Sequence, residues 1–154
     1  MKNRVLTTLL SFLLISLCST GAYAADDERA QKAIDTRQGL LKVVGHYFGP
    51  IVGMAQGKVP FDADMARDNA NKIAQLTPMI PDVFALDTRA NGLESDALDG
   101  VWENNDDFNS KAVTATERAL ALAAAADQGK GAFAKAVGGV GSACKSCHED
   151  YRQK

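Results

Sequence analysis

Two cysteines and a histidine near the end of the chain have the spacing of a covalent cofactor site. Residues 144–148 read Cys-Lys-Ser-Cys-His, a C-x-x-C-H motif. Two thiols this close can add across the two vinyl groups of one porphyrin, and the histidine that follows then lies against the iron. A neutral imidazole is a common metal ligand. The motif therefore predicts one haem c per chain, attached through Cys144 and Cys147, with His148 as the iron ligand.

Three other interpretations of the motif are possible. A structural zinc site normally has four Cys or His ligands, and outside the motif the sequence offers only Cys18 and His46. A thioredoxin-like C-x-x-C accompanies a βαβ pattern, whereas no alternating strand pattern is present here. A disulfide within the motif would not require the histidine. A thiol–disulfide oxidoreductase would use the same two cysteines, and a thiol assay would distinguish it because thioethers leave no titratable thiol.

The first residues resemble a secretory signal peptide. Lys2 and Arg4 precede a mostly apolar run at residues 5–17, and residues 22–24 read Ala-Tyr-Ala, an A-x-A cleavage pattern. The run is shorter than the ~20 residues of a membrane-spanning helix, so an uncleaved anchor is the less favoured alternative. A leucine precedes Cys18, which argues against a lipoprotein signal.

We therefore predict a cleaved signal peptide at residues 1–24 and one mature domain at residues 25–154, with no membrane span. Both cysteines of the mature domain belong to the C-x-x-C-H motif, which fits export to the periplasm. Cleavage takes the formal charge of the chain from −2 to about −4. This mildly acidic balance gives no support for nucleic-acid binding.

Apolar residues at helical spacing predict four helices, at about residues 27–52, 62–76, 101–126 and 132–152, with a long connection at residues 77–100. The residues expected to face the core are Ile34, Leu41, Val44, Phe48 and Ile51, then Met65, Ile73 and Leu76, then Trp102, Phe108, Ala112, Ala119 and Leu122, and finally Phe133, Val137, Val140, Cys144, Cys147 and Tyr151. The pattern predicts an all-α fold, an antiparallel up-down-up-down four-helix bundle that holds the covalently attached haem against its core.

Polar residues at helix ends and glycines refine this picture. Asp26 and Asp27 are expected to cap the first helix, and Asp62 the second. Gly138, Gly139 and Gly141 lie in the last predicted helix, where glycine is a poor helix former. They either let a neighbouring helix or the porphyrin approach closely or mark a local kink.

Arg37 and Gln38 interrupt the apolar stripe of the first predicted helix. An unpaired buried charge is strongly destabilising, so a buried Arg37 needs an anion. A haem propionate would provide that anion, with Gln38 as a neutral donor. The alternative is that the Arg37 side chain reaches solvent along the edge of the stripe.

The sixth coordination position of the iron decides between two functions. Only residues 149–154 follow the motif, so a second protein ligand must come from upstream. The mature chain offers Met54, Met65, Met79 and His46. His46 lies about 140° from Leu41 around the helix, so it points away from the apolar stripe. Leu41 itself cannot bind iron, and we therefore predict five-coordinate iron beneath an apolar lid.

The chain resembles cytochrome c′, the high-spin class II c-type cytochromes. The resemblance covers essentially the whole mature chain and rests on Arg37-Gln38, Phe48-Gly49, Val101-Trp102, Phe108, the motif at residues 144–148 and Tyr151-Arg152. It implies a periplasmic four-helix bundle that forms a homodimer through its first two helices. The residues that it places at the haem are Cys144, Cys147, His148, Arg37, Gln38, Asp96 and Leu41. In the related low-spin class II cytochromes a methionine stands in place of Leu41 and binds the iron.

These features predict a haem protein that binds small diatomic gases, nitric oxide and carbon monoxide, and that takes part in electron transfer with a periplasmic partner. A lid without a hydrogen-bond donor disfavours stable dioxygen binding. A six-coordinate electron carrier is the alternative. Arg152, one turn after His148, either steers a ligand on the second face of the haem or is an ordinary surface arginine. No acid–base pair or nucleophile is evident, so no enzyme is predicted.

Overall fold

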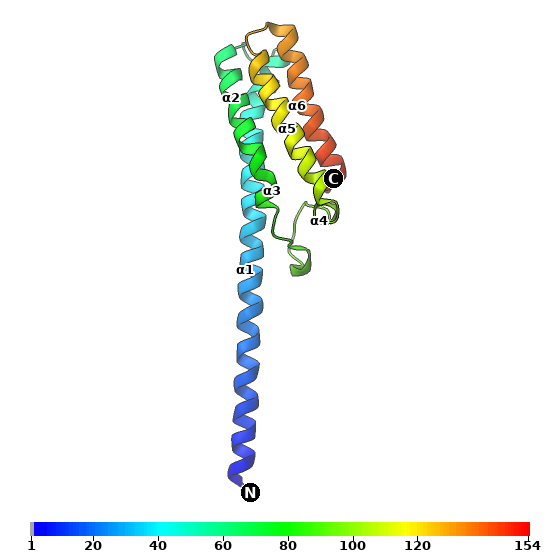
Figure 1. Ribbon diagram of the computed structural model, residues 1–154. Coiled ribbons are helices and arrows are strands. Elements are labelled where there is room, and N and C mark those ends of the chain that lie inside the picture. Colours follow the sequence, from blue (N-terminus) through cyan, green and yellow to red (C-terminus); the bar gives the residue numbers. More distant parts are fainter. Residues whose placement is uncertain (1) are drawn as a thin grey trace.

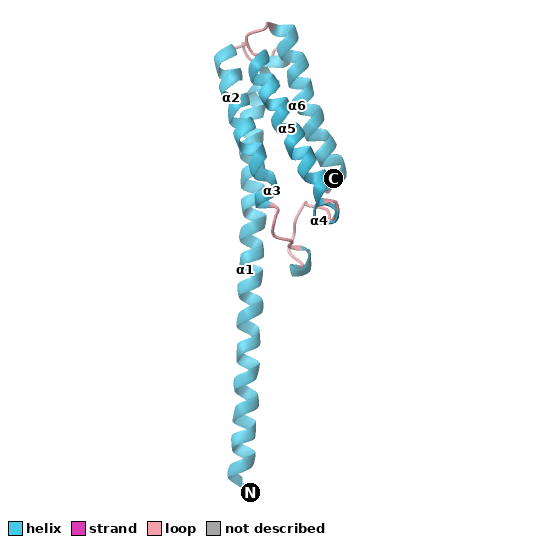
Figure 2. Ribbon diagram, in the orientation of Figure 1, coloured by secondary structure: helices cyan, strands magenta, loops and turns pink. Residues whose placement is uncertain are grey.

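The computed structural model of the chain describes residues 2–154, with side chains from residue 25 onward. The predicted signal peptide, residues 1–24, lies outside the part whose side chains are described. Helices make up most of residues 2–154, and within these residues the only extended pairing is an isolated antiparallel bridge between Ala97 and Arg152 (Figure 2).

The helices in chain order are α1 (Lys2–Ala55), α2 (Ala63–Leu76), the 3-10 helix η1 (Thr77–Met79), α3 (Ile80–Val83), the 3-10 helix η2 (Arg89–Asn91), α4 (Gly100–Glu103), α5 (Asn105–Ala125) and α6 (Lys130–Tyr151). Figure 1 shows α1, α2, α5 and α6 side by side, each running in the opposite direction to the one before it. α3 continues the course of α2, and α1 extends beyond the bundle at its N-terminal end. The predicted up-down-up-down four-helix bundle is confirmed.

Two apolar clusters form the core. The larger one joins all four long helices and contains Ile51, Ile73, Leu122, Phe133 and Val140 among its most deeply buried members. The smaller one lies near the C-terminus and consists of Phe84, Val101, Phe108 and Tyr151. Burial of large side chains such as these contributes roughly 1.5–3 kcal/mol each. The apolar stripes predicted for the third and fourth helices therefore face the core as expected.

The first helix does not begin where the acidic pair suggested. Asp26 and Asp27 lie inside α1 instead of capping it, because the helix already runs from Lys2. Their carboxylates accept hydrogen bonds from the side-chain amide of Asn91, at 3.3 Å and 3.0 Å. The apolar residues that precede them continue the same helix, so no N-terminus exists at this point for the two aspartates to satisfy.

The second helix begins as predicted but buries a different face. The Asp62 carboxylate accepts a hydrogen bond from the backbone N–H of Met65 at 2.9 Å, so it caps α2. Met65 was expected in the core, yet its side chain is 47% exposed. Small residues, Ala66 and Ala70, lie on the buried face instead and allow α2 to approach its neighbours.

The predicted connection at residues 77–100 is shorter in the structure because its first part is helical. Pro78 and Pro81 each lie at the start of a short helix, η1 and α3, where the missing N–H of proline costs no hydrogen bond. The third predicted helix is divided at Asn104, whose backbone (φ −121°, ψ 47°) separates α4 from α5. Neither feature follows from apolar periodicity.

Candidate haem site

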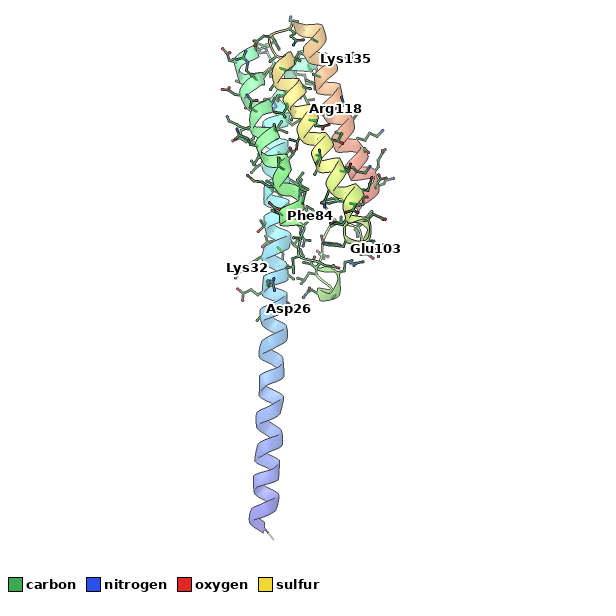
Figure 3. All side chains as sticks on the ribbon, in the orientation of Figure 1. Asp26, Lys32, Phe84, Glu103, Arg118 and Lys135 are labelled. Carbon is green, nitrogen blue, oxygen red and sulfur yellow. The ribbon has the colours of Figure 1, made fainter. Side chains whose placement is uncertain are left out.

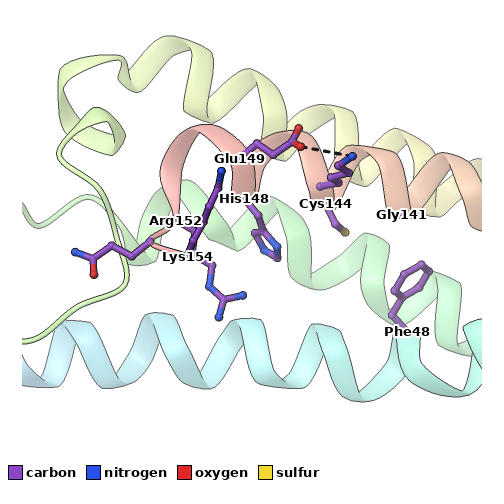
Figure 4. Close-up of a pocket in the computed structure, with 9 residues that line it drawn as sticks. Phe48, Gly141, Cys144, His148, Glu149, Arg152 and Lys154 are labelled. Carbon is purple, nitrogen blue, oxygen red and sulfur yellow. Dashed lines mark ion pairs between the residues drawn. The ribbon is translucent and has the colours of Figure 1, made fainter.

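The C-x-x-C-H motif occupies the last turns of α6. Residues at i, i+3 and i+4 share one side of a helix, so Cys144, Cys147 and His148 project together from α6. A cleft of about 540 Å³ lies beside them, lined by Phe48, Gly141, Cys144, Lys145, His148, Glu149, Arg152, Gln153 and Lys154. Figure 4 shows His148 and Cys144 pointing from α6 toward the space between α6 and α1, with Phe48 rising from α1 at one end. Cys147 is half-buried against the smaller apolar cluster.

The two thiols have the character of structural cysteines. They are not bonded to each other. Burial raises the pKa of both, and for Cys147 to about 11, even though Lys111 pulls that pKa down. Reactive thiols in oxidoreductases have lowered pKa values, so this environment disfavours the thiol–disulfide interpretation. Among the described residues, no cluster of three or more His, Cys, Asp or Glu side chains is placed to hold a metal ion.

His148 is held in the form that binds a metal. Its pKa is lowered first by burial and then by the positive charge of Arg152, so the imidazole is neutral near pH 7. Arg152 in turn forms an ion pair with Asp96 at 3.6 Å. Two backbone hydrogen bonds also join the segment at residues 96–98 to the end of α6. Leu98 N–H donates to the Tyr151 carbonyl at 3.0 Å, and Gln153 N–H donates to the Asp96 carbonyl at 2.8 Å.

The cleft fits a flat apolar group bonded to α6. A Cβ added at Gly141 would meet no atom within 4 Å, so the glycine leaves open space at the wall of the cleft. The two interpretations of Gly141, close approach of a bound group and a local kink, both stay open. At Gly139 an added Cβ would lie 3.6 Å from the Arg118 side chain, so that glycine faces a neighbouring helix. The cleft volume falls in the range of cofactor sites.

The opposite wall of the cleft comes from α1. Phe48 lines the cleft, and Leu41 lies on the same face of α1, seven residues or about two turns earlier. Leu41 is 38% exposed and is not among the residues that line the cleft. Gln38 is exposed. The structure therefore does not bring Leu41 and Gln38 into contact with the motif, and their haem contacts stay predictions.

The four possible sixth ligands all lie elsewhere. His46 is exposed and packs edge-on against its neighbour Tyr47, as the helical spacing predicted. Met65 and Met79 are both 47% exposed. Met54 is buried, but it lines a different cavity near the start of α6. Within the described residues, no second histidine and no methionine lines the cleft beside His148.

Arg37 is buried among neutral hydrogen-bond acceptors. Its side chain does not reach solvent, since only 2% of the residue is exposed. The guanidinium donates to the carbonyls of Val83 (3.1 Å) and Leu86 (2.6 Å) and to the Thr88 hydroxyl (3.1 Å). It also lies 5.2 Å from the ring centre of Trp102. Burial lowers the pKa of Arg37, and Asp87 partly offsets this effect. The acceptors that the protein itself offers to the guanidinium are neutral, and the contact of Arg37 with a haem propionate stays a prediction.

A polar cluster behind the motif was missed by the sequence analysis. It contains Asp107 and Lys111 of α5 with Ser146, Asp150 and Tyr151 of α6. A signal for it existed, because Lys111 lies three residues after the core residue Phe108 and four after Asp107. A lysine at the edge of an apolar stripe is usually solvated, so this spacing alone did not distinguish Lys111 from other surface lysines.

A four-helix bundle whose last helix presents two half-buried cysteines and an imidazole at a cleft defines a c-type haem protein. The sequence model of the cytochrome c′ family matches residues 32–152, and the chain belongs to this family. It is 36% identical over 156 residues to a cytochrome c′ of Cereibacter sphaeroides, covering 100% of this chain and 99% of that protein. The chain therefore carries haem c at Cys144 and Cys147.

Solved structures of the family have the same fold. Cytochrome c′ from Rhodobacter sphaeroides aligns with a TM-score of 0.75 and 36% identity, over 81% of this chain and 98% of that one. The nitric oxide complex of a variant of cytochrome c prime from Alcaligenes xylosoxidans aligns with a TM-score of 0.71 and 27% identity, over 81% of this chain and 97% of that one. No described helix of the present chain is both long and apolar enough to cross a membrane.

Proposed function

We propose that this chain is a periplasmic haem protein with five-coordinate iron that binds nitric oxide and carbon monoxide and takes part in electron transfer. The observation that carries the proposal is the composition of the cleft, where His148 is the one imidazole and no methionine is present among the described lining residues. The relative from Alcaligenes xylosoxidans that forms a nitric oxide complex supports the choice of ligand.

The chain contributes one ligand and one lid. His148 binds the iron on one face through its neutral imidazole. Because α1 and α6 are antiparallel, Leu41, seven residues before Phe48, lies at about the level of His148 and covers the other face. Haem supplies one open coordination position and a one-electron redox couple. Leucine offers no hydrogen-bond donor, so nitric oxide and carbon monoxide are favoured over dioxygen.

Two polar residues of α1 and an ion pair near the motif complete the proposed site. Two N–H groups of Arg37 remain after its three hydrogen bonds, and they are assigned to a haem propionate together with Gln38. Asp96 forms an ion pair with Arg152, which lines the cleft. Arg152 lines this cleft, which supports its role in steering a ligand near His148 over that of an ordinary surface arginine.

The proposed assembly is a homodimer packed through α1 and α2. Both helices expose large apolar side chains, Val43 at 42% and Met65 at 47%, which supports a contact surface there. The proposed location in the periplasm follows from the signal-peptide pattern at residues 1–24 and from the haem-attachment motif. The mature chain is then expected to begin at Ala25.

The absorption spectrum of the reduced protein, with and without carbon monoxide and nitric oxide, tests the proposal. Five-coordinate iron gives a high-spin spectrum with a broad Soret band that shifts when either gas is added. A low-spin spectrum with sharp α and β bands, unmoved by carbon monoxide, would mean that a protein side chain occupies the sixth position. The chain would then be a six-coordinate electron carrier.

Substitution of Leu41 makes the test specific to the lid. Leu41→Met places a thioether sulfur at the proposed distal face, and we expect a low-spin reduced spectrum with weakened carbon monoxide binding. Leu120→Met is the matched control, because Leu120 is 54% exposed on α5, away from the cleft. If the two variants have the same spectra and the same carbon monoxide affinity, Leu41 does not cover the iron.

A further inference from the structure

A lysine on α5 forms polar contacts with the turn of α6 that carries the haem motif, on the side facing α5. The Lys111 ammonium forms an ion pair with Asp150 at 2.9 Å and donates a hydrogen bond to the Ser146 hydroxyl at 3.0 Å. It also lies 3.7 Å from the Asp107 carboxylate of its own helix. Only 19% of the Lys111 side chain is exposed, against 55% for Asp150 and 61% for Asp107. This lysine is therefore much less solvated than a typical surface lysine.

The two residues of α6 that Lys111 contacts lie on either side of His148 in the sequence. Ser146 and Asp150 are two residues before and after His148, so both project about 160° away from the imidazole, toward α5. Tyr151 adds a second link between the same helices, since its hydroxyl donates to the Asp107 carboxylate at 2.6 Å. The cluster thus holds one side of the turn against α5, while His148 projects from the other side toward α1 (Figure 4).

The cluster also places charge close to the haem attachment point. Lys111 is one cation between two carboxylates, Asp107 and Asp150. Its charge lies beside the haem attachment point, because the Lys111 ammonium is 3.0 Å from the hydroxyl of Ser146, the residue that precedes Cys147 in the motif. A positive charge near the haem favours the ferrous over the ferric state, and a negative charge does the reverse.

We propose that Lys111 is a positioning residue for the haem, which orients the turn carrying His148 and raises the reduction potential through its charge. The inference deepens the proposed function and rests on it only for the role of His148 as iron ligand. Loss of Lys111 leaves two carboxylates uncompensated behind the turn, whereas loss of the Asp150 charge leaves Lys111 paired with Asp107 alone.

The test is a redox titration of the haem-loaded protein, followed by absorbance. The Lys111→Met protein is compared with the parent at the potential where the parent is half reduced. We expect its ratio of reduced to oxidised haem to be lower than that of the parent, by up to about threefold. Asp150→Asn is expected to shift the potential the opposite way, and Lys111→Arg to return it toward the parent value. Lys135→Met is the matched control, because it removes the same charge from an exposed position near the other end of α6 (Figure 3).

The opposite signs of the two shifts in reduction potential distinguish an effect of charge from a loss of structure. A structural lesion alone would shift Lys111→Met and Asp150→Asn in the same direction and would not be reversed by arginine. The proposal is overturned if both shifts have one sign, or if Lys111→Met moves the potential no more than Lys135→Met. If Lys111→Met accumulates without haem, the Asp150→Asn and Lys111→Arg titrations still decide the charge effect. Failure of the gas-binding proposal would be seen separately, as a low-spin spectrum of the unsubstituted protein.

Discussion

At the scale of single residues, Tyr151 shows how one hydroxyl couples the site to the core. Its ring packs edge-on against Phe108 in the smaller apolar cluster, and its hydroxyl donates to Asp107 of α5. The hydrogen bond to the carboxylate, together with burial, raises the pKa of Tyr151 to about 12. The fold therefore stabilises the protonated phenol, and this stabilisation is sensitive to alkaline pH.

The pH dependence of stability has a definite sign. The pKa of tyrosine in an unfolded chain is about 10, below the folded value. The stabilisation by Tyr151 is fully present below pH 10 and is lost as the pH rises toward 12. Tyr151→Phe should be less stable than the parent near pH 8, and the difference should shrink between pH 10 and pH 12 in urea unfolding. A difference that stays constant over this range would contradict the assignment.

At the scale of elements, Arg37 ties α1 to the segment between α3 and η2. That segment has few backbone hydrogen bonds of its own. The Leu86 carbonyl within it and the Val83 carbonyl at the end of α3 accept from the guanidinium. Phe84 and Trp102 pack against the same guanidinium at 5.1 Å and 5.2 Å, and the Trp102 indole N–H donates to the Phe84 carbonyl at 2.9 Å. Arg37 therefore acts as a connector between elements, whatever its contact with the haem.

Removal of this connector is expected to destabilise the whole bundle. Arg37→Met keeps much of the side-chain volume but leaves the two carbonyls without their donors, which costs about 2–4 kcal/mol of unfolding free energy. Arg29→Met is the matched control on the same helix, since Arg29 is exposed and its substitution should change stability by less than about 0.5 kcal/mol. Equal unfolding midpoints for the two variants in urea would show that the hydrogen bonds of Arg37 contribute little.

The elements also show what sequence alone can predict. Apolar periodicity identified the core faces of α5 and α6, because Phe108, Leu122, Phe133 and Val140 recur at helical spacing and are buried. It placed Met65 wrongly, because packing by alanines, not hydrophobicity, selects the buried face of α2. The motif located the cysteines and the imidazole, since their spacing is set by chemistry. The polar cluster at Lys111 depends on how α5 and α6 meet, which no local pattern encodes.

At the scale of the whole molecule, the site lies where the first and last helices of the bundle face each other. α6 packs more extensively on α5 than on α1, and the cleft opens on the α1 side. A group bonded to α6 therefore packs between helices that are far apart in sequence. These contacts are expected to stabilise the native bundle, because the unfolded chain keeps the covalent bonds but loses the packing. Haem attachment and completion of the fold are expected to be coupled for this reason.

Mass spectrometry of the exported protein tests signal-peptide cleavage, haem attachment and dimer formation together. We expect a denatured mass equal to the chain from Ala25 with one haem that survives unfolding, because thioether bonds at two cysteines are covalent. Under native conditions the mass should double if the exposed apolar residues of α1 and α2 form the homodimer contact. Cys18→Ser should leave both masses unchanged, since residue 18 lies in the predicted signal peptide. A mass that retains residues 1–24, or a haem lost on denaturation, would contradict the processing and attachment scheme, and a single-chain native mass would contradict the dimer alone.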